Sequence, residues 1–234
     1  MSGVLYLFPV ELGESKLKNI IPEYNIELIS SIKFFIVEDI RTARRFLKRC
    51  NSAINIDEIE FFVLNKHTEE RELMTFITPL KRGCDVGLLS EAGCPAIADP
   101  GADIVAMAQS ADIKVVPLVG PSSILLSLMA SGFNGQSFAF NGYLPIQEQD
   151  KIKTLKLFEK RIYSENQTQI FIETPYRNNK IIQEIIKHCQ PLTKLCIAAN
   201  ITLENEFIKT KTLNDWKKSV PDLQKHPCIF LLYK

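Results

Sequence analysis

The chain has few residues of the types that build metal centres and disulfide frameworks. Its 234 residues include six cysteines and three histidines, and the cysteines are scattered without any Cys-x-x-Cys pair. Zinc ligands usually come in closely spaced pairs, so this pattern predicts no metal site. Scattered cysteines are typical of free thiols in a reducing compartment, and we therefore expect a cytoplasmic protein.

The sequence also lacks the usual glycine-rich motifs that bind the phosphates of nucleotides. Neither G-x-G-x-x-G nor G-x-x-x-x-G-K-[ST] occurs, and no lysine or arginine lies between Glu91 and Ala111. Those motifs bring backbone N–H groups, and in the second case a lysine, onto a pyrophosphate or triphosphate. Their absence argues against an ordinary dinucleotide or triphosphate site.

Excess charge of one sign and long membrane-spanning runs are missing too. Lysine and arginine total 28 against 27 acidic residues, which argues against wholesale wrapping of nucleic acid but allows a local basic patch. Residues 115–147 contain no charged side chain, but several prolines, asparagines and glycines interrupt this segment. Residues 1–15 lack the basic start and cleavage site of a signal peptide. We therefore expect no membrane association.

Small residues dominate the most informative stretch, which runs from Val86 to Ser123. It reads as a strand, a loop rich in Gly, Ala and Pro, a helix, a second strand and the loop Gly120-Pro121-Ser122-Ser123. In open α/β sheets, ligands bind at the carboxyl ends of parallel strands. Asp99 is an acceptor among these bare backbone groups, so the loops suit an uncharged or cationic ligand such as an adenosyl sulfonium.

The alternation of apolar runs and helical segments predicts an α/β fold with two domains. Residues 1–145 read as an N-terminal α/β domain with about five mostly parallel strands. Residues 146–234 read as a smaller mixed α/β domain, with residues 146–150 as the linker. The predicted strands are Val4–Phe8, Lys33–Val37, Glu60–Leu64, Val86–Leu89, Lys114–Val119, Gln169–Ile172, Lys194–Ala199 and Cys228–Leu232. The segment between Ala199 and Leu213 reads as a polar loop rich in Thr and Glu.

Charged residues follow the second predicted strand. Glu38 and Asp39 come directly after it, where a carboxylate is placed to act as a general base or to cap the next helix. Both interpretations stay open at this point. Arg41, Arg44 and Arg45 recur at helical spacing and form a candidate contact for RNA phosphates.

Two further sets of residues are candidate contacts for RNA. Lysines and arginines recur from Lys151 to Arg161, where a solvated helix face is an equally good explanation. Tyr176 is the best single candidate for stacking on a base, and Arg177 beside it is a further candidate substrate contact.

Six segments occur in an order that resembles one known family. They are LYLFPVELGE, EDIR, LLSEAGCPAIADPG, VVPLVGPSS, FNGYLP and ETPYR. Together they resemble the tetrapyrrole methylase family of S-adenosylmethionine-dependent methyltransferases, in the branch that methylates a ribose 2′-hydroxyl of small-subunit ribosomal RNA. The resemblance implies two α/β domains with the cofactor in the cleft between them, a homodimer, and ribosomal RNA or the small ribosomal subunit as substrate.

The resemblance also carries the family's cofactor-binding positions onto this chain. In the family, these positions form the loop under the ligand, the Asp-Pro element beside it, the start of the following helix, and the second-domain segments that close over it. Glu38 and Asp39 match the acidic pair of the branch, and we rank them first as catalytic candidates. The cofactor-binding residues implied are Ser90, Glu91, Ala92, Gly93, Asp99, Pro100, Gly101, Ser122, Ser123, Ile124, Thr174, Ala199, Pro227 and Cys228.

The chain departs from the branch at three segments. Residues 9–14 read PVELGE where the branch has PTPIGN, residues 38–43 read EDIRTA where it has EDTRHT, and residues 199–202 read ANIT where it has RELT. These changes concern the substrate side more than the cofactor side. Two alternatives therefore remain: a methyltransferase of a tetrapyrrole or other small molecule, and a catalytically silent module that binds S-adenosylmethionine.

Overall fold

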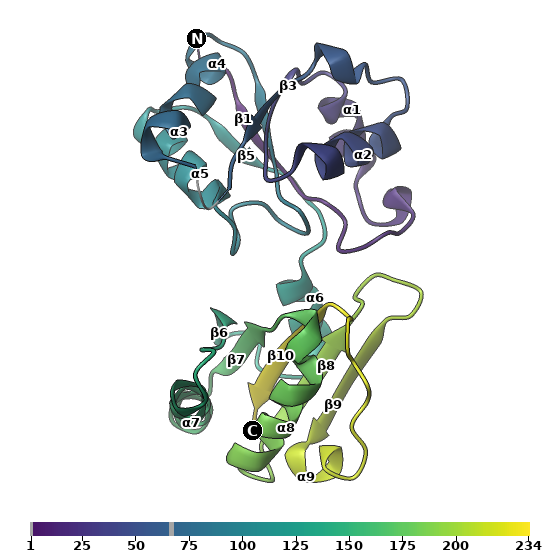
Figure 1. The fold of residues 1–234 in the computed structure, drawn as a ribbon, viewed down its shortest axis with the longest axis vertical. Helices are drawn as coiled ribbons and strands as arrows, with labels where there is room; N and C mark the ends of the chain where they lie inside the picture. Colours follow the sequence, from purple (N-terminus) through teal and green to yellow (C-terminus); the bar gives the residue numbers. More distant parts are fainter. Residues whose placement is uncertain (1, 66–67) are drawn as a thin grey trace. The chain divides into compact units, whose positions relative to one another are not determined.

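The computed structural model describes residues 2–65 and 68–234. Contacts within the chain divide it into two compact units, Met1–Ser122 and Ser123–Lys234. Each unit is built on a five-stranded sheet with helices packed against it (Figure 1). Within the described ranges, no helix combines the length and the apolar character needed to cross a membrane.

The sheet of the first unit is parallel throughout, and its strand order is β3-β2-β4-β1-β5. The expectation of a mostly parallel sheet of about five strands is therefore confirmed. The strands are β1 (Leu5–Phe8), β2 (Phe34–Val37), β3 (Glu60–Val63), β4 (Val86–Leu89) and β5 (Val115–Pro117).

Successive side chains of these strands enter separate cores on the two faces of the sheet. In β2, Phe35 and Val37 join one core and Ile36 joins the other, because side chains alternate along a strand. The first core also holds residues of η1 (Leu17–Asn19), α1 (Glu23–Ile29) and α2 (Ile40–Cys50), with η2 (Ile56–Glu58) at its edge. The second core also holds residues of α3 (Glu70–Phe76), α4 (Thr78–Lys81) and α5 (Gly101–Ser110).

This arrangement makes one edge of the sheet suitable for a ligand. Phe8 and Val37 both pair in register with Leu89, so the segments that follow β1, β2 and β4 begin side by side. The segments after β1 and β2 lead to helices on one face, whereas the segment after β4 leads to α5 on the other. Neighbouring connections therefore leave this edge toward opposite faces of the sheet, and open α/β sheets bind ligands at such a position.

The sheet of the second unit is mixed, with strand order β6-β7-β10-β8-β9. The β6 and β7 strands are parallel, and the remaining neighbours are antiparallel. The strands are β6 (Phe138–Tyr143), β7 (Thr168–Ile172), β8 (Lys194–Ala199), β9 (Phe207–Thr212) and β10 (Cys228–Tyr233).

Helices pack against this second sheet around one large core. Phe171 and Phe230 stack with ring centroids 5.7 Å apart. Trp216 is buried in the same core, and its indole N–H donates to the Leu195 carbonyl. The helices are α6 (Ser123–Ser131), α7 (Glu148–Glu165), η3 (Pro175–Arg177), α8 (Asn178–His188) and α9 (Leu213–Trp216). Core residues of α7, α8 and α9 lie in this cluster, and α6 contacts β9 and β10.

The structure differs from the sequence-based expectation at three places. Residues 123–145, expected in the first domain, belong to the second unit because β6 pairs with β7 and α6 packs on the second sheet. The predicted linker 146–150 already contains the first turn of α7. The predicted polar loop ends in β9, which pairs along its whole length with β8. This strand was not predicted because its second half, Lys209–Thr212, alternates lysine and threonine and is not apolar.

Candidate functional site

The loop after β4 is held in place by backbone contacts with the loop after β1. Val10 and Gly93 exchange two backbone hydrogen bonds of 2.9 and 3.0 Å. Gly93 has φ +75°, a conformation that suits glycine, and the hydroxyl of buried Ser90 lies 3.3 Å from its carbonyl oxygen. The predicted cofactor loop Ser90–Gly93 is therefore anchored at its buried end, while Glu91 and Ala92 remain exposed.

Asp99 organises the next part of this loop. Its Oδ1 accepts hydrogen bonds from the N–H groups of Ala96 (3.0 Å) and Gly101 (2.7 Å), whereas its buried Oδ2 has no partner among the described residues. Burial raises the pKa of the Asp99 carboxyl, and the two N–H donors oppose that effect. A Cβ on Gly101 would lie 2.8 Å from Oδ1, so only glycine allows this close turn.

Two alanines of the same loop adopt backbone conformations that L-residues rarely use. Ala96 has φ +66° and Ala98 has φ +62°. Such conformations cost on the order of 1–3 kcal/mol each and occur preferentially at ligand-binding sites. The strain therefore marks the segment after β4 as a candidate ligand-binding loop.

The acidic pair after β2 is divided between two roles. Asp39 caps α2, because its Oδ1 accepts from the Thr42 N–H at 2.9 Å, and this bond lowers the pKa of its carboxyl. Glu38 instead turns to the neighbouring loop, where its Oε1 accepts from the Glu91 N–H at 3.1 Å. Burial is the largest cause of the raised pKa of Glu38, and the nearby charges of Asp99 and Glu91 add to it.

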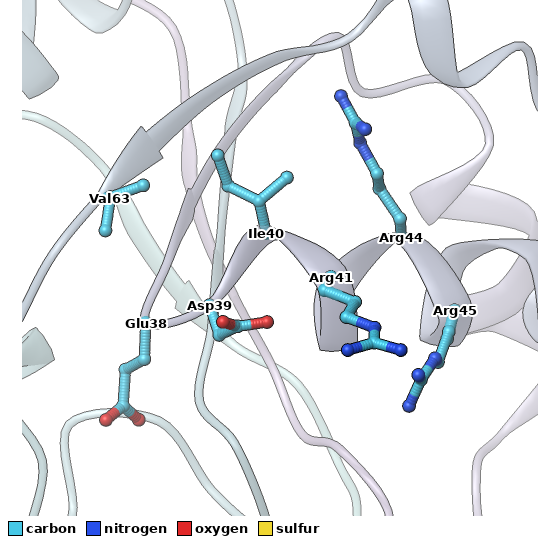
Figure 2. A pocket seen from close by; sticks show the side chains of 7 residues that line it. All are labelled: Glu38, Asp39, Ile40, Arg41, Arg44, Arg45 and Val63. Carbon is cyan, nitrogen blue, oxygen red and sulfur yellow. The ribbon is translucent and has the colours of Figure 1, made fainter.

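Three arginines of α2 border a hollow of about 570 Å³ beside this acidic pair. Figure 2 shows Arg41 and Arg45 extending to the same side of the helix, as expected for residues four apart, and Arg44 extending to the other. The Arg44 guanidinium lies 5.6 Å from the centre of the Phe61 ring. Among the residues that the structure describes, no acidic side chain forms an ion pair with Arg41 or Arg45.

Several lysines of the second cationic stretch, in α7, form ion pairs within the protein. Lys151 is buried and pairs with Glu184 at 2.8 Å, while Lys153 and Lys156 pair with acidic residues of their own helix. These contacts neutralise three of the five basic residues in the stretch and favour the interpretation of a stabilised helix face, whereas Lys160 and Arg161 form no ion pair with a described residue. Both α2 and α7 are rich in basic residues, but they differ in how many of these residues are free of ion pairs and could bind a partner.

The predicted cofactor residues of the second unit lie at one end of its sheet. Ala199 pairs in register with Cys228, and the carbonyl of Pro227 accepts from the Asn200 N–H at 3.0 Å. The loop after β7 reaches the same region, because the Lys225 N–H donates to the Pro175 carbonyl at 3.0 Å. Thr174 belongs to this loop.

Arg177 and Tyr176, the two predicted substrate contacts of this loop, are placed differently. Arg177 contacts buried Glu173 at 2.5 Å and the Thr174 hydroxyl at 3.0 Å, so it supports the loop. Tyr176 is 72% exposed. Only the tyrosine therefore presents a free surface to a partner.

The remaining predicted cofactor residues stand at element boundaries. Pro100 precedes α5, Gly101 begins it, and Ser122 ends the first unit. Ser123 and Ile124 open α6 and belong to the second unit. The predicted set is thus split between the two units.

Sequence reasoning missed two residues that fix the geometry of the first unit. The Thr42 hydroxyl donates to Glu91 Oε1 at 2.6 Å and so ties α2 to the cofactor loop. Arg49, at the far end of α2, pairs with Glu11 of the first loop. The three-residue spacing between Asp39 and Thr42 indicates the cap, but no sequence signal indicates a contact across 49 positions.

The charges and hydrogen-bonding groups of the first-unit loop fit an adenosyl sulfonium. Glu38, Glu91 and Asp99 surround the loop with negative charge, which favours a cation, and the loop itself contains no basic residue. The unpartnered Asp99 Oδ2 would gain a hydrogen bond from a hydroxyl or amine. Across the described ranges, no group of three His, Cys, Asp or Glu side chains is placed to hold a metal ion.

Solved structures with a similar fold are methyltransferases. The methyltransferase CobJ matches with a TM-score of 0.65 at 12% identity, covering 100% of this chain and 95% of that one. The uroporphyrin-III-C-methyltransferase of Thermus thermophilus matches with a TM-score of 0.57 at 16% identity, covering 100% and 93%. At these identities, the likeness shows the shared fold.

Sequence comparisons give closer relatives. "Ribosomal RNA small subunit methyltransferase I" of Vibrio cholerae is 30% identical over 88% of this chain and 67% of that protein. The protein of the same name from Escherichia coli O157:H7 is also 30% identical, over 98% and 77%. The model of the tetrapyrrole (corrin/porphyrin) methylases matches residues 26–216. The chain therefore belongs to the tetrapyrrole methylase family and is an S-adenosylmethionine-dependent methyltransferase.

Proposed function

We propose that the protein methylates a ribose 2′-hydroxyl in ribosomal RNA of the small subunit. The observation that carries the proposal is the hollow where Arg41, Arg44 and Arg45 stand beside Glu38 and Asp39, at the ligand-binding edge of the parallel sheet. Free guanidinium groups suit phosphates, and a carboxylate beside them suits a hydroxyl. The relatives named as small-subunit ribosomal RNA methyltransferases support this substrate class.

In this proposal, the residues that would hold the cofactor are those of the first-unit loop. Ser90–Gly93 would supply backbone groups and Asp99 would supply the acceptor. When bound, S-adenosylmethionine supplies an electrophilic methyl group on sulfur. The protein contributes chiefly positioning and charge, since methyl transfer from a sulfonium is an in-line displacement.

Glu38 is the better candidate for the general base. Glu38 would accept the proton of the 2′-hydroxyl as that oxygen takes up the methyl group, so that the oxygen ends as a neutral ether and the carboxylate as a carboxylic acid. Its raised pKa makes it a stronger base than an ordinary glutamate. Asp39 is a weaker candidate, because the cap bond and its lowered pKa commit it to α2.

The experiment is transfer of labelled methyl groups to small ribosomal subunits from a strain that lacks the homologous enzyme. Incorporation that makes one phosphodiester bond resistant to alkali identifies a 2′-O-methyl group, because alkaline cleavage requires a free 2′-hydroxyl. Labelling of a base, or of a tetrapyrrole instead of RNA, would contradict the proposal. Cofactor binding by calorimetry with no transfer to any subunit would favour the silent module.

Glu38→Gln tests the base in the same assay. We expect kcat to fall about 10²- to 10⁴-fold. In the wild type, kcat should rise with pH as Glu38 loses its proton, and the raised pKa places this rise above the range of an ordinary glutamate. The variant should lose that limb of the profile. Asp39→Asn, which retains an N-cap acceptor, is the matched control and should leave the limb in place.

A further inference from the structure

A second hollow, remote in sequence from the arginine cluster, lies in the second unit. It measures about 320 Å³ and borders the end of α6 and the adjoining ends of three strands. We call it the lysine hollow. Its lining residues are Ser131, Gly132, Phe133, Lys194, Thr210, Lys211, Thr212, Tyr233 and Lys234.

Lysines at the ends of three strands line this hollow. Tyr233 and Thr212 pair in register with Lys194 from either side, so Lys194, Lys211 and Lys234 gather at one end of the sheet. Among the described residues that line the hollow, none has an acidic side chain. Lys194 and Lys234 are exposed and form no ion pair with any described residue, while Lys211 lies 4.6 Å from the Trp216 ring centre.

Hydroxyl groups, not these lysines, bind the carbonyls at the end of α6. Helix C-terminal carbonyls attract cations, but hydroxyl groups contact them here. The Ser131 hydroxyl donates to the Leu128 carbonyl at 2.8 Å, and the Thr210 hydroxyl donates to the Ser131 carbonyl at 2.8 Å. The ammonium groups of Lys194 and Lys234 are therefore left for an external anion.

An aromatic pair forms part of the same wall. Phe133 and Tyr233 have ring centroids 5.4 Å apart, and both rings are half-buried. The Tyr233 hydroxyl donates to Asn166 Oδ1 at 2.7 Å, which fixes the orientation of that ring. Rigid aromatic rings beside lysines are the combination with which proteins bind single-stranded nucleic acid, through base stacking and phosphate contacts.

We propose that the lysine hollow binds a single-stranded segment of the RNA substrate, with phosphates at Lys194 and Lys234 and a base against Phe133 and Tyr233. The inference rests on the proposed function, because it assigns the second unit a share in holding the same RNA. It gives the enzyme a substrate contact outside the arginine hollow, so that recognition extends beyond the methylated nucleotide.

The test compares two double variants that each remove two exposed lysines of the second unit. Lys194→Ala/Lys234→Ala removes the hollow's free charges. Lys153→Ala/Lys180→Ala is the matched control, since these lysines are 77% and 74% exposed in their side chains and pair with acidic residues. Binding of small-subunit rRNA is measured against KCl concentration, together with methyl transfer to small subunits.

We expect the hollow variant to raise the Kd for rRNA about 3- to 10-fold and to lower the slope of log K against log salt by about 1.5 units, with kcat unchanged. The control should change neither quantity. Phe133→Leu, which retains an apolar side chain, should raise Kd without changing the slope, because stacking involves no counterions.

Equal salt slopes for both double variants, in a wild type that methylates subunits, would overturn this inference alone. A wild type that transfers no methyl group to RNA would overturn the proposed function as well. Inorganic phosphate provides a separate arm: if it raises the melting temperature of the wild type but not of Lys194→Ala/Lys234→Ala, while rRNA affinity is the same, the occupant is a small anion and the RNA contact is wrong.

Discussion

Asp99 combines a structural task with the ligand-binding task that we propose for it. Its Oδ1 closes the turn into α5 through two N–H donors, and its Oδ2 is buried without a partner among the described residues. Leaving a buried oxygen unpaired costs about 1–3 kcal/mol. A ligand hydroxyl or amine that reaches Oδ2 would remove that cost, which makes this carboxylate the anchor of the proposed cofactor site.

Asp99→Asn separates the two tasks, because the amide oxygen still accepts from Ala96 and Gly101 while the charge is lost. We expect affinity for S-adenosylmethionine to fall by about 1–3 kcal/mol, measured by calorimetry, with little change in melting temperature. Wild-type affinity should also fall as pH decreases through the raised pKa of Asp99, at a pH above that expected for an ordinary aspartate. The variant should lack this dependence; unchanged affinity would show that the site is misplaced.

At the scale of elements, α2 links the proposed substrate and cofactor sides of the first unit. Its exposed arginines line the 570 Å³ hollow, its first turn holds the loop after β4, and Arg49 in its last turn holds the loop after β1. The carboxyl-edge loops are thus attached to one helix at both of its ends. A shift of α2 would therefore move all of them together.

Thr42→Val removes the hydroxyl that joins α2 to Glu91 but leaves the N–H that Asp39 caps. We expect KM for S-adenosylmethionine to rise several-fold, consistent with the loss of about 0.5–1.5 kcal/mol from one hydrogen bond. The melting temperature should change little, because Thr42 and Glu91 are exposed. Thr42→Ser retains the hydroxyl and should restore KM; failure of this rescue would contradict a positioning role.

At the scale of the whole molecule, each unit has its own hydrophobic cores. Phe35 is fully buried in the first unit, and Phe230 is fully buried in the second. The core of the second unit also holds Trp216, the single tryptophan of the chain. Fluorescence of Trp216 therefore reports on the second unit alone, whereas circular dichroism reports on both. The homodimer implied by the family resemblance stays a prediction.

Phe35→Ala should destabilise the first unit by about 3–5 kcal/mol, the usual cost of removing a buried ring. We expect urea unfolding followed by circular dichroism to begin earlier, while the Trp216 fluorescence transition keeps its midpoint. Phe230→Ala is the counterpart and should shift the fluorescence transition. If Phe35→Ala shifts both signals equally, the two units unfold as one cooperative structure.

Local sequence patterns determined much of this protein. Apolar runs such as Val4–Phe8 and Lys194–Ala199 predicted buried strands, because a strand covered on both faces must be apolar throughout. The small residues from Ser90 to Gly101 predicted a ligand loop, and the six motif segments predicted the family that the comparisons confirm. These signals lie in neighbouring residues, where spacing alone carries the information.

Only the tertiary structure decided what depends on contacts between distant segments. Glu38 and Asp39 are equivalent in sequence, but the Glu91 backbone 53 positions away separates their roles. The basic stretches of α2 and α7 look alike, yet Glu184 neutralises Lys151 of α7, whereas the described acidic residues leave Arg41 and Arg45 unpaired. Charge, burial and pKa depend on which groups folding brings within a few ångströms, and that neighbourhood is not encoded in local spacing.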